Sequence, residues 1–220
     1  MTRRDGTDIP ADAWEFMHPQ MQGSKPWVVV RPSIPGPKTV LVLGAFRGGT
    51  SFAAERLATI GVCLGRDYGP VTPEPNYVSY EDPHLGKLID EINENAHIGA
   101  SNADNWQHFR TLVSQHNSSN PDVWGFKKPS SVFVLDAILP ILRNPHAILI
   151  LRDPIASWQS SIRHGRDLGW HNCRHHHCVL LDHIEKPRCP LLVLSFELAL
   201  KQVKEVESAM QQFVFGERDA

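Results

Sequence analysis

The sequence predicts an α/β fold of three layers, in which helices cover both faces of a central parallel sheet. Short, continuous apolar runs occur at residues 40–43, 147–151 and 191–194, as expected for strands that are buried on both faces. Between such runs, apolar residues recur at helical spacing, as at Ala53, Leu57 and Ile60. Strands that alternate with helices favour parallel pairing, with the connecting helices packed on both sides of the sheet.

The predicted elements follow one another in a simple order. Residues 1–37 are polar and rich in proline, and we interpret them as an extended N-terminal arm with a short edge strand at 27–30. The α/β domain covers residues 38–220, with strands at 40–43, 123–126, 147–151 and 191–194. One helix is expected to begin at Pro83, with Asp82 as its N-cap. A last helix has an apolar face made of Val203, Val206, Met210 and Phe213.

Composition excludes several classes of partner. The 220 residues include 22 lysines and arginines against 24 aspartates and glutamates, so we expect binding to neither nucleic acid nor an anionic membrane. No apolar stretch approaches the roughly 20 residues that a membrane helix needs. The N-terminus lacks the apolar core of a secretory signal, and four cysteines are too few for a disulfide framework. These features favour a cytoplasmic protein.

A glycine-rich stretch follows the first strand of the domain. Residues 46–51 read FRGGTS, and with Gly44 they fit the phosphate-binding pattern G-x-x-x-x-G-K-[ST], except that Thr50 replaces the lysine. Glycines let the backbone approach an anion, the first helical amides point at it, and Arg47 adds a permanent charge. The alternative is an ordinary strand-to-helix turn with Thr50 or Ser51 as the N-cap.

A second polar pair follows the strand at 147–151. Arg152 leaves the strand end, and Ser160 lies eight residues further along the chain in a predicted helix. Ligands of parallel sheets bind at the carboxyl ends of the strands, so both side chains could face one ligand there. The alternative pairs Arg152 with a nearby carboxylate such as Asp153 and leaves Ser160 on a solvated helix face.

Together these stretches resemble the sulfotransferase family that uses 3′-phosphoadenosine 5′-phosphosulfate (PAPS) as donor. Residues 47–51 are similar to that family's R/K-S-G-T-[ST] turn, and Arg152 with Ser160 is similar to its second signature. Further similar pieces are GVCLG at 61–65, YED at 80–82, WGFKKP at 124–129 and LLVLSFELAL at 191–200. The resemblance runs from about Thr39 to Phe215, with the pieces in the family's order.

The resemblance implies a three-layer, P-loop NTPase-like fold with a central parallel sheet of about five strands. It also implies that PAPS is held at its 5′-phosphosulfate by Arg47, Gly48, Gly49, Thr50 and Ser51, and at its 3′-phosphate by Arg152 and Ser160. No metal is expected, because a sulfuryl group carries less negative charge than a phosphoryl group and fixed cations and amides can stabilise the leaving phosphate.

The resemblance further supplies candidates for the transfer step. Glu81 is the expected base that accepts the proton of the acceptor, and His84 is the second choice. Lys127 corresponds to the cation at the sulfuryl group, although Lys128 leaves the assignment ambiguous by one residue. Alternatively, Glu81 only stabilises the start of the next helix, and the two lysines form a solvated pair.

The acceptor is expected to be a small molecule or carbohydrate with a hydroxyl or amine. Aromatic residues that line its pocket or belong to the core are Tyr68, Tyr77, Tyr80, Trp106 and Phe109. Two features depart from the family pattern: Gly48 replaces its usual serine, and no late R-K-G loop is present. A second subunit would complete such a pared-down donor lid, so a homo-oligomer is one expectation.

Two other functions remain open at this stage. One is a small P-loop kinase or phosphotransferase, which the missing P-loop lysine disfavours. The other is a non-catalytic nucleotide-binding protein on the same fold. A cluster of potential zinc ligands also occurs in a region where Leu180 and Leu181 suggest a helix, but its spacing matches no known zinc finger: His171, Cys173, His175, His176, His177, Cys178 and His183.

Overall fold

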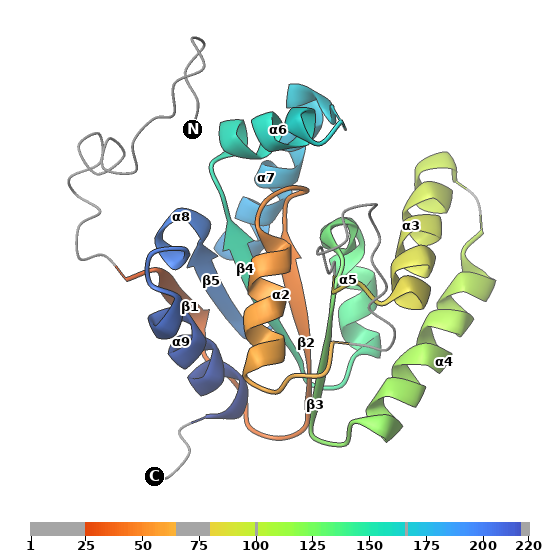
Figure 1. The fold of residues 1–220 in the computed structure, drawn as a ribbon. Coiled ribbons are helices and arrows are strands. Elements are labelled where there is room, and N and C mark those ends of the chain that lie inside the picture. Colours follow the sequence, from red (N-terminus) through yellow and green to blue (C-terminus); the bar gives the residue numbers. More distant parts are fainter. Residues whose placement is uncertain (1–24, 65–79, 100, 166, 217–220) are drawn as a thin grey trace.

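The fold is built on a five-stranded sheet (Figure 1). The computed structural model describes residues 25–64, 80–99, 101–165 and 167–216. The strands are β1 (Trp27–Arg31), β2 (Lys38–Gly44), β3 (Val123–Lys127), β4 (Pro145–Leu151) and β5 (Leu191–Ser195). They are ordered β1-β5-β4-β2-β3, and β2 to β5 run parallel to one another. The predicted α/β fold with a central, mostly parallel sheet is therefore confirmed.

The sheet differs from the prediction in one strand. β1 lies at the edge and pairs antiparallel with β5, so the sheet is not parallel throughout. The reason lies in the connection, because residues 32–37 are too few to return the chain to the opposite end of the sheet before β2 begins. The described part of the predicted arm, residues 25–37, thus includes a strand that belongs to the sheet.

Helices cover both faces of the sheet (Figure 1). One face carries α2 (Thr50–Thr59) and α9 (Val203–Phe215), with the short α8 (Phe196–Ala199) after β5. The other carries the segment η2 (Pro129–Val134), α5 (Leu135–Ile138) and η3 (Leu139–Ile141), together with α7 (Gly169–Glu185). Two further helices, α3 (Pro83–Ile98) and α4 (Ala103–Ser119), pack beside β3, and α6 (Pro154–Arg163) follows β4.

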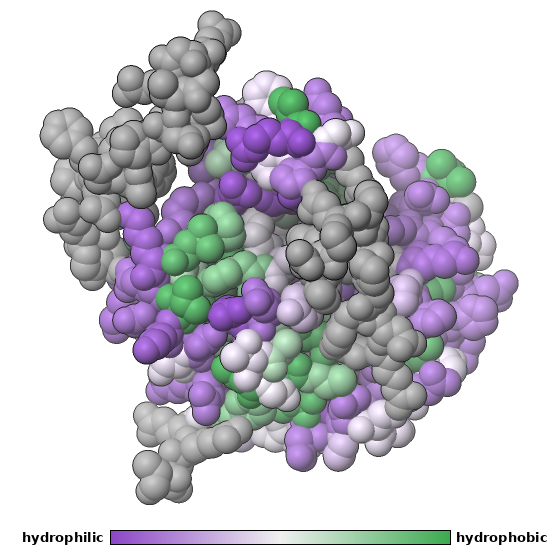
Figure 2. Space-filling model, viewed as in Figure 1, coloured by the Kyte–Doolittle hydropathy of each residue, from purple (hydrophilic) through white to green (hydrophobic). Residues whose placement is uncertain are grey.

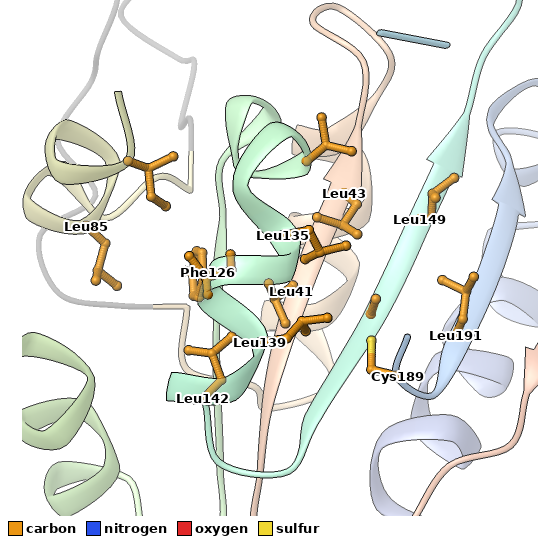
Figure 3. Packing of buried hydrophobic residues seen from close by; sticks show 14 of the residues in the cluster. Leu41, Leu43, Leu85, Phe126, Leu135, Leu139, Leu142, Leu149, Cys189 and Leu191 are labelled. Carbon is orange, nitrogen blue, oxygen red and sulfur yellow. The ribbon is translucent and has the colours of Figure 1, made fainter. Parts of the chain in front are cut away.

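Side chains of successive residues in β2 pack alternately into two separate hydrophobic clusters. Leu41 and Leu43 face the cluster beneath the η2–η3 segment, whereas Val40 and Val42 face the cluster beneath α2 and α9. Figure 3 shows Leu41 and Leu43 beside Leu135 and Leu139 of that segment, with Leu149 on the neighbouring strand β4. Burial of β2 on both faces explains why its sequence is continuously apolar, and it fixes the strand that leads into the glycine-rich turn.

The start of α3 matches its prediction. Asp82 is the N-cap and Pro83 the first helical residue, and Asp82 Oδ1 accepts hydrogen bonds from the amides of His84 (2.9 Å) and Leu85 (3.0 Å). Among the described residues, no helix combines the length and apolar character that crossing a membrane requires.

Candidate functional site

The predicted site residues gather at the carboxyl edge of the sheet. β2 lies between β4 and β3, so its glycine-rich turn is flanked by Arg152, which follows β4, and by Lys127, which ends β3. The chain passes from β2 to β3 on one side and then to β4 on the other side of β2. This edge is therefore a topological switch point, where open α/β sheets bind their ligands.

The turn after β2 is tight enough to require glycine at two positions. The Gly48 amide donates to the carbonyl oxygen of Ala45 (2.8 Å), and a Cβ at Gly48 would lie only 2.7 Å from that oxygen. Gly49 has φ 91°, a conformation that favours glycine, and a Cβ there would overlap the ring of Phe196. A serine at position 48, as in the family pattern, would not fit without a wider turn.

Helix α2 begins without a side-chain cap. Its N-cap is Gly49, which has no side chain, so the alternative of Thr50 or Ser51 as the N-cap is wrong. The first amides of a helix have no partners within the helix, and its dipole places partial positive charge there. The structure thus leaves the first turn of α2 suited to an anion at the end of β2.

Arg47, Arg152 and Ser160 are linked to one another. Arg152 Nη1 donates to the carbonyl oxygen of Arg47 (2.8 Å), and Arg47 Nε lies 3.4 Å from Ser160 Oγ. Ser160 is only 4% exposed, so the alternative of a solvated helix face is wrong. Within the described ranges, neither arginine has a carboxylate oxygen within 4.0 Å, which also excludes the ion pair of Arg152 with Asp153. Two cations of this edge therefore lack a direct carboxylate partner.

Two residues to which the sequence analysis gave no such role position Arg152. The centroid of the Phe196 ring lies 4.7 Å from the guanidinium carbon and supports the charged group, and His177 Nε2 lies 2.9 Å from the Arg152 carbonyl oxygen. Burial lowers the pKa of Arg152, yet a guanidinium stays charged at neutral pH. Figure 2 shows an apolar area over α8 and α2. Phe196, in α8, packs edge to face with Phe52 of α2. No sequence spacing connects Phe196 with Arg152.

A second cluster joins α3 to the end of β3. Lys127 Nζ lies 2.7 Å from Glu81 Oε1, and Lys128 Nζ lies 3.4 Å from Glu81 Oε2 and 2.7 Å from Asp90 Oδ2. Ser130 Oγ donates to Asp90 Oδ1 (2.8 Å). Lys127 is 3% exposed, so the alternative of a solvated lysine pair is wrong. The structure therefore brings Glu81 and Lys127 into direct contact and adds Asp90, which the sequence did not indicate.

Asp82, not Glu81, caps α3. Besides its amide contacts, Asp82 Oδ2 lies 3.2 Å from Nε2 of His116, whose ring stacks on Trp124. Burial alone would raise the pKa of Asp82, but the bonds from His116 and from the helix amides outweigh it and lower the pKa. Asp82 thus fixes the start of α3 and leaves the Glu81 carboxylate to the lysines.

The other candidates for the base and the acceptor pocket lie in different parts of the chain. His84 lies in the first turn of α3 and lines a pocket of about 500 Å³ between α3 and α4, with Leu88, His108 and Leu112. Phe109 is fully buried and Trp106 packs against it, so both belong to the hydrophobic core. Tyr68 and Tyr77 lie outside the described residues.

Three histidines of α7 pack against or bond to the η2 segment. His175 and His176 stack on Phe133, and His183 Nε2 donates to the carbonyl of Val132 (3.1 Å). In the part of the chain that the structure describes, no group of three or more histidine, cysteine or acidic side chains is arranged to hold a metal ion. The histidine-rich stretch is therefore a packing element behind the glycine-rich turn, since His176 also contacts Phe46 (ring centroids 4.7 Å apart).

Comparisons with known proteins give matches only to solved structures. No protein-family model and no curated protein matches the chain. The chain is similar to TT1252 from Thermus thermophilus, with 13% identity, coverage of 80% of this chain and 97% of that one, and a TM-score of 0.48. It is similar to a gluconokinase from Sinorhizobium meliloti (12%, 81% and 94%, TM-score 0.44) and a sulfotransferase from Mycobacterium avium (14%, 94% and 69%, TM-score 0.44). Similarity at this level assigns no activity to the chain.

Proposed function

We propose that the protein transfers a sulfuryl group from PAPS to a hydroxyl or amine of a small-molecule or carbohydrate acceptor. The observation that carries this proposal is the linked set of Arg47, Arg152 and Ser160 around the uncapped start of α2. It provides two permanent cations, one in the turn and one bonded to the turn's backbone, and within the described ranges neither has a carboxylate oxygen within 4.0 Å. A nucleotide with separate 5′ and 3′ anionic groups matches that arrangement better than a linear triphosphate does.

The transfer step follows from the second cluster. The acceptor oxygen or nitrogen attacks sulfur as the bond from sulfur to the 5′-phosphate oxygen breaks, and Glu81 takes the proton of the acceptor. Arg47 and the first amides of α2 stabilise the charge that grows on the leaving phosphate. Lys127 keeps Glu81 in place through their 2.7 Å contact, and its remaining N–H groups can donate to a sulfuryl oxygen.

Ligand binding tests the donor. Unfolding temperatures of the full chain are measured with 3′,5′-adenosine bisphosphate, adenosine 5′-monophosphate, and ATP plus Mg²⁺. At a hundred times its Kd, a ligand adds about 2.7 kcal/mol of stability. The bisphosphate should stabilise at far lower concentration than the monophosphate. Equal affinity for these two nucleotides would contradict the two-anion site.

Turnover tests the reaction. Labelled PAPS is supplied with a panel of phenols, sugars and amines, with and without EDTA. Transfer should persist in EDTA, because fixed side-chain cations stabilise the charge. Activity that is lost on chelation and restored by Mg²⁺ with ATP as donor would instead establish a kinase, and tight bisphosphate binding without any transfer would establish a non-catalytic nucleotide-binding protein.

A further inference from the structure

One buried cation lies at the opposite end of the sheet from the candidate site. Lys38 is the first residue of β2, and it is 4% exposed. Its Nζ donates to Ser33 Oγ at 3.2 Å. Among the described residues, no carboxylate oxygen lies within 4.0 Å of this nitrogen, whereas the other deeply buried lysine, Lys127, pairs with Glu81. A buried ammonium without a counter-charge is costly, so its environment calls for an explanation.

The neighbours of Lys38 do not neutralise it. His146 Nδ1 faces the carbonyl oxygen of Asn144 (2.9 Å) and therefore carries the proton. Its Nε2 then accepts from the Ile34 amide and lies 3.0 Å from Ser33 Oγ. Burial lowers the pKa of His146, and the charge of Lys38 lowers it further. This network holds Ser33 in place but supplies no negative charge.

Lys38 also lines a pocket. The pocket has a volume of about 380 Å³ and lies between the loop before β2, the start of β3 and the end of α9. Its walls are largely apolar and consist of Pro35, Pro37, Val123, Val214 and Phe215, with Lys38, Ser33, Gly36, Asp122 and Gly216 completing the lining. A volume of this size is typical of a small-ligand site, where apolar walls surround a few polar groups.

The donors of Lys38 exceed the acceptors around it. An ammonium has three N–H groups, and Ser33 Oγ is the one acceptor within hydrogen-bond distance among the residues that the structure describes. Burial lowers the pKa of Lys38, which reflects the same lack of compensation. An anion in the pocket would accept from the remaining N–H groups and supply the missing charge.

We propose that this pocket is a second ligand site, separate from the sulfuryl-transfer site, that binds a small carboxylic acid with an apolar body. The carboxylate accepts from Lys38 Nζ, and the hydrocarbon part packs on the two prolines and Phe215. A monoanion fits better than a phosphate dianion, because one cation is present and Asp122 adds a negative charge to the lining. Figure 1 shows the loop before β2 at the end of the sheet opposite α6, so both sites could be filled at once.

Isothermal titration of the full chain with defined probes tests the proposal. Benzoate and hexanoate are the carboxylate probes, benzyl alcohol is the neutral analogue, and inorganic phosphate is the competing anion. The carboxylates should bind, with benzyl alcohol and phosphate at least about tenfold weaker. Lys38→Met should weaken benzoate binding by about ten- to a hundredfold, because it removes a charge-assisted hydrogen bond. The matched control is Lys204→Met, an exposed lysine of α9.

Two further measurements keep the proposal testable if Lys38→Met does not fold. Asp122→Asn removes the acidic lining residue and should strengthen benzoate binding by about two- to fivefold. Saturation with 3′,5′-adenosine bisphosphate should leave benzoate binding unchanged. The proposal is overturned if the carboxylates fail to bind, if phosphate or benzyl alcohol binds as tightly, if Lys38→Met binds like the parent, or if the bisphosphate displaces benzoate. None of these outcomes depends on sulfuryl transfer.

Discussion

The glycine-rich turn and the Glu81 cluster, which consists of Glu81, Asp90, Lys127 and Lys128, occupy the same edge of the sheet. They differ in the groups that contact their cations. At the turn, Arg47 and Arg152 contact a hydroxyl, a carbonyl and an aromatic ring. In the cluster, Lys127 and Lys128 contact the carboxylates of Glu81 and Asp90. Among the residues that the structure describes, the arginines of the turn have no direct carboxylate partner, whereas the two lysines are balanced by two carboxylates.

This difference separates binding from chemistry. Cations held by neutral groups can attract an anionic ligand without first losing an ion pair. A carboxylate held by two ammonium groups is fixed in position, and in the proposed mechanism it takes the proton of the acceptor. We therefore expect changes at the turn to affect donor affinity, and changes at Glu81 to affect turnover with donor affinity preserved.

The largest expected effect is that of Glu81→Gln. The amide keeps the shape of the side chain but cannot accept the acceptor's proton, so kcat should fall by roughly 10²–10⁴-fold. The affinity for 3′,5′-adenosine bisphosphate should stay within about twofold. Both are measured with labelled PAPS and a working acceptor, and by titration of the bisphosphate.

The matched control for that substitution is Glu91→Gln, in helix α3, which begins two residues after Glu81. Glu91 pairs with the exposed Lys87 (3.6 Å), so its loss should leave kcat near the parent value. Normal turnover in Glu81→Gln would show that Glu81 is not the base and only pairs with the lysines. His84→Gln would then be the next variant to test.

A second prediction concerns the loss of folding stability at acid pH near the glycine-rich turn. His176 is 3% exposed and packs against Phe46, which precedes Arg47. Burial, with smaller contributions from His175 and His177, lowers its pKa from 6.5 to about 4. Between these values the unfolded chain binds more protons than the folded chain, so stability falls as pH falls from 6.5 towards 4. The loss amounts to about 3 kcal/mol.

Urea unfolding at a series of pH values measures this loss. His176→Phe keeps an aromatic ring against Phe46 and Phe133 but cannot titrate, so its stability should decline less between pH 6.5 and 4. The control is His175→Phe, an exposed ring that stacks on the same Phe133. An equal change of slope in both variants would contradict burial of His176 as the cause. The pKa of Asp82, next to Glu81, is lowered from its ordinary value of 3.8. The stability that Asp82 contributes is therefore lost only as pH falls below 3.8.

The same two regions show how far the sequence alone could predict the molecule. Strands β2, β4 and β5 are buried on both faces, so their apolar runs predicted them within a few residues. Helix α4 was not predicted, because only Phe109, Val113 and His116 of its 17 residues are buried. A helix that buries so narrow a stripe shows little hydrophobic periodicity.

For the site, local motifs predicted what lies within one segment, and packing decided the rest. Arg47 and Ser51 share a turn, and Arg152 and Ser160 share a strand end and its helix, so spacing could identify each pair. Asp90 reaches Lys128 only because α3 packs on η2, and Phe196 reaches Arg152 only because β5 lies beside β4. No local pattern encodes such contacts between distant segments.

The smallest expected effect is a difference in bisphosphate affinity between a variant of the turn and a variant of the Glu81 cluster. Arg152→Ala should weaken 3′,5′-adenosine bisphosphate by about ten- to a hundredfold, the usual value of a charge-assisted hydrogen bond. Lys128→Met should change that affinity by less than about threefold, because Lys128 already contacts Asp90 (2.7 Å) and Glu81 (3.4 Å). Titration calorimetry measures both.

A monophosphate control separates loss of a contact from damage to the turn. Arg152 also donates to the Arg47 carbonyl, so Arg152→Ala could loosen the turn itself. If Arg152 holds the 3′-phosphate, adenosine 5′-monophosphate should bind parent and variant equally, and only the bisphosphate should lose affinity. If the turn is loosened, both nucleotides lose affinity together. If Arg152→Ala and Lys128→Met lost bisphosphate affinity equally, the two regions would not differ in how their cations bind an anionic ligand.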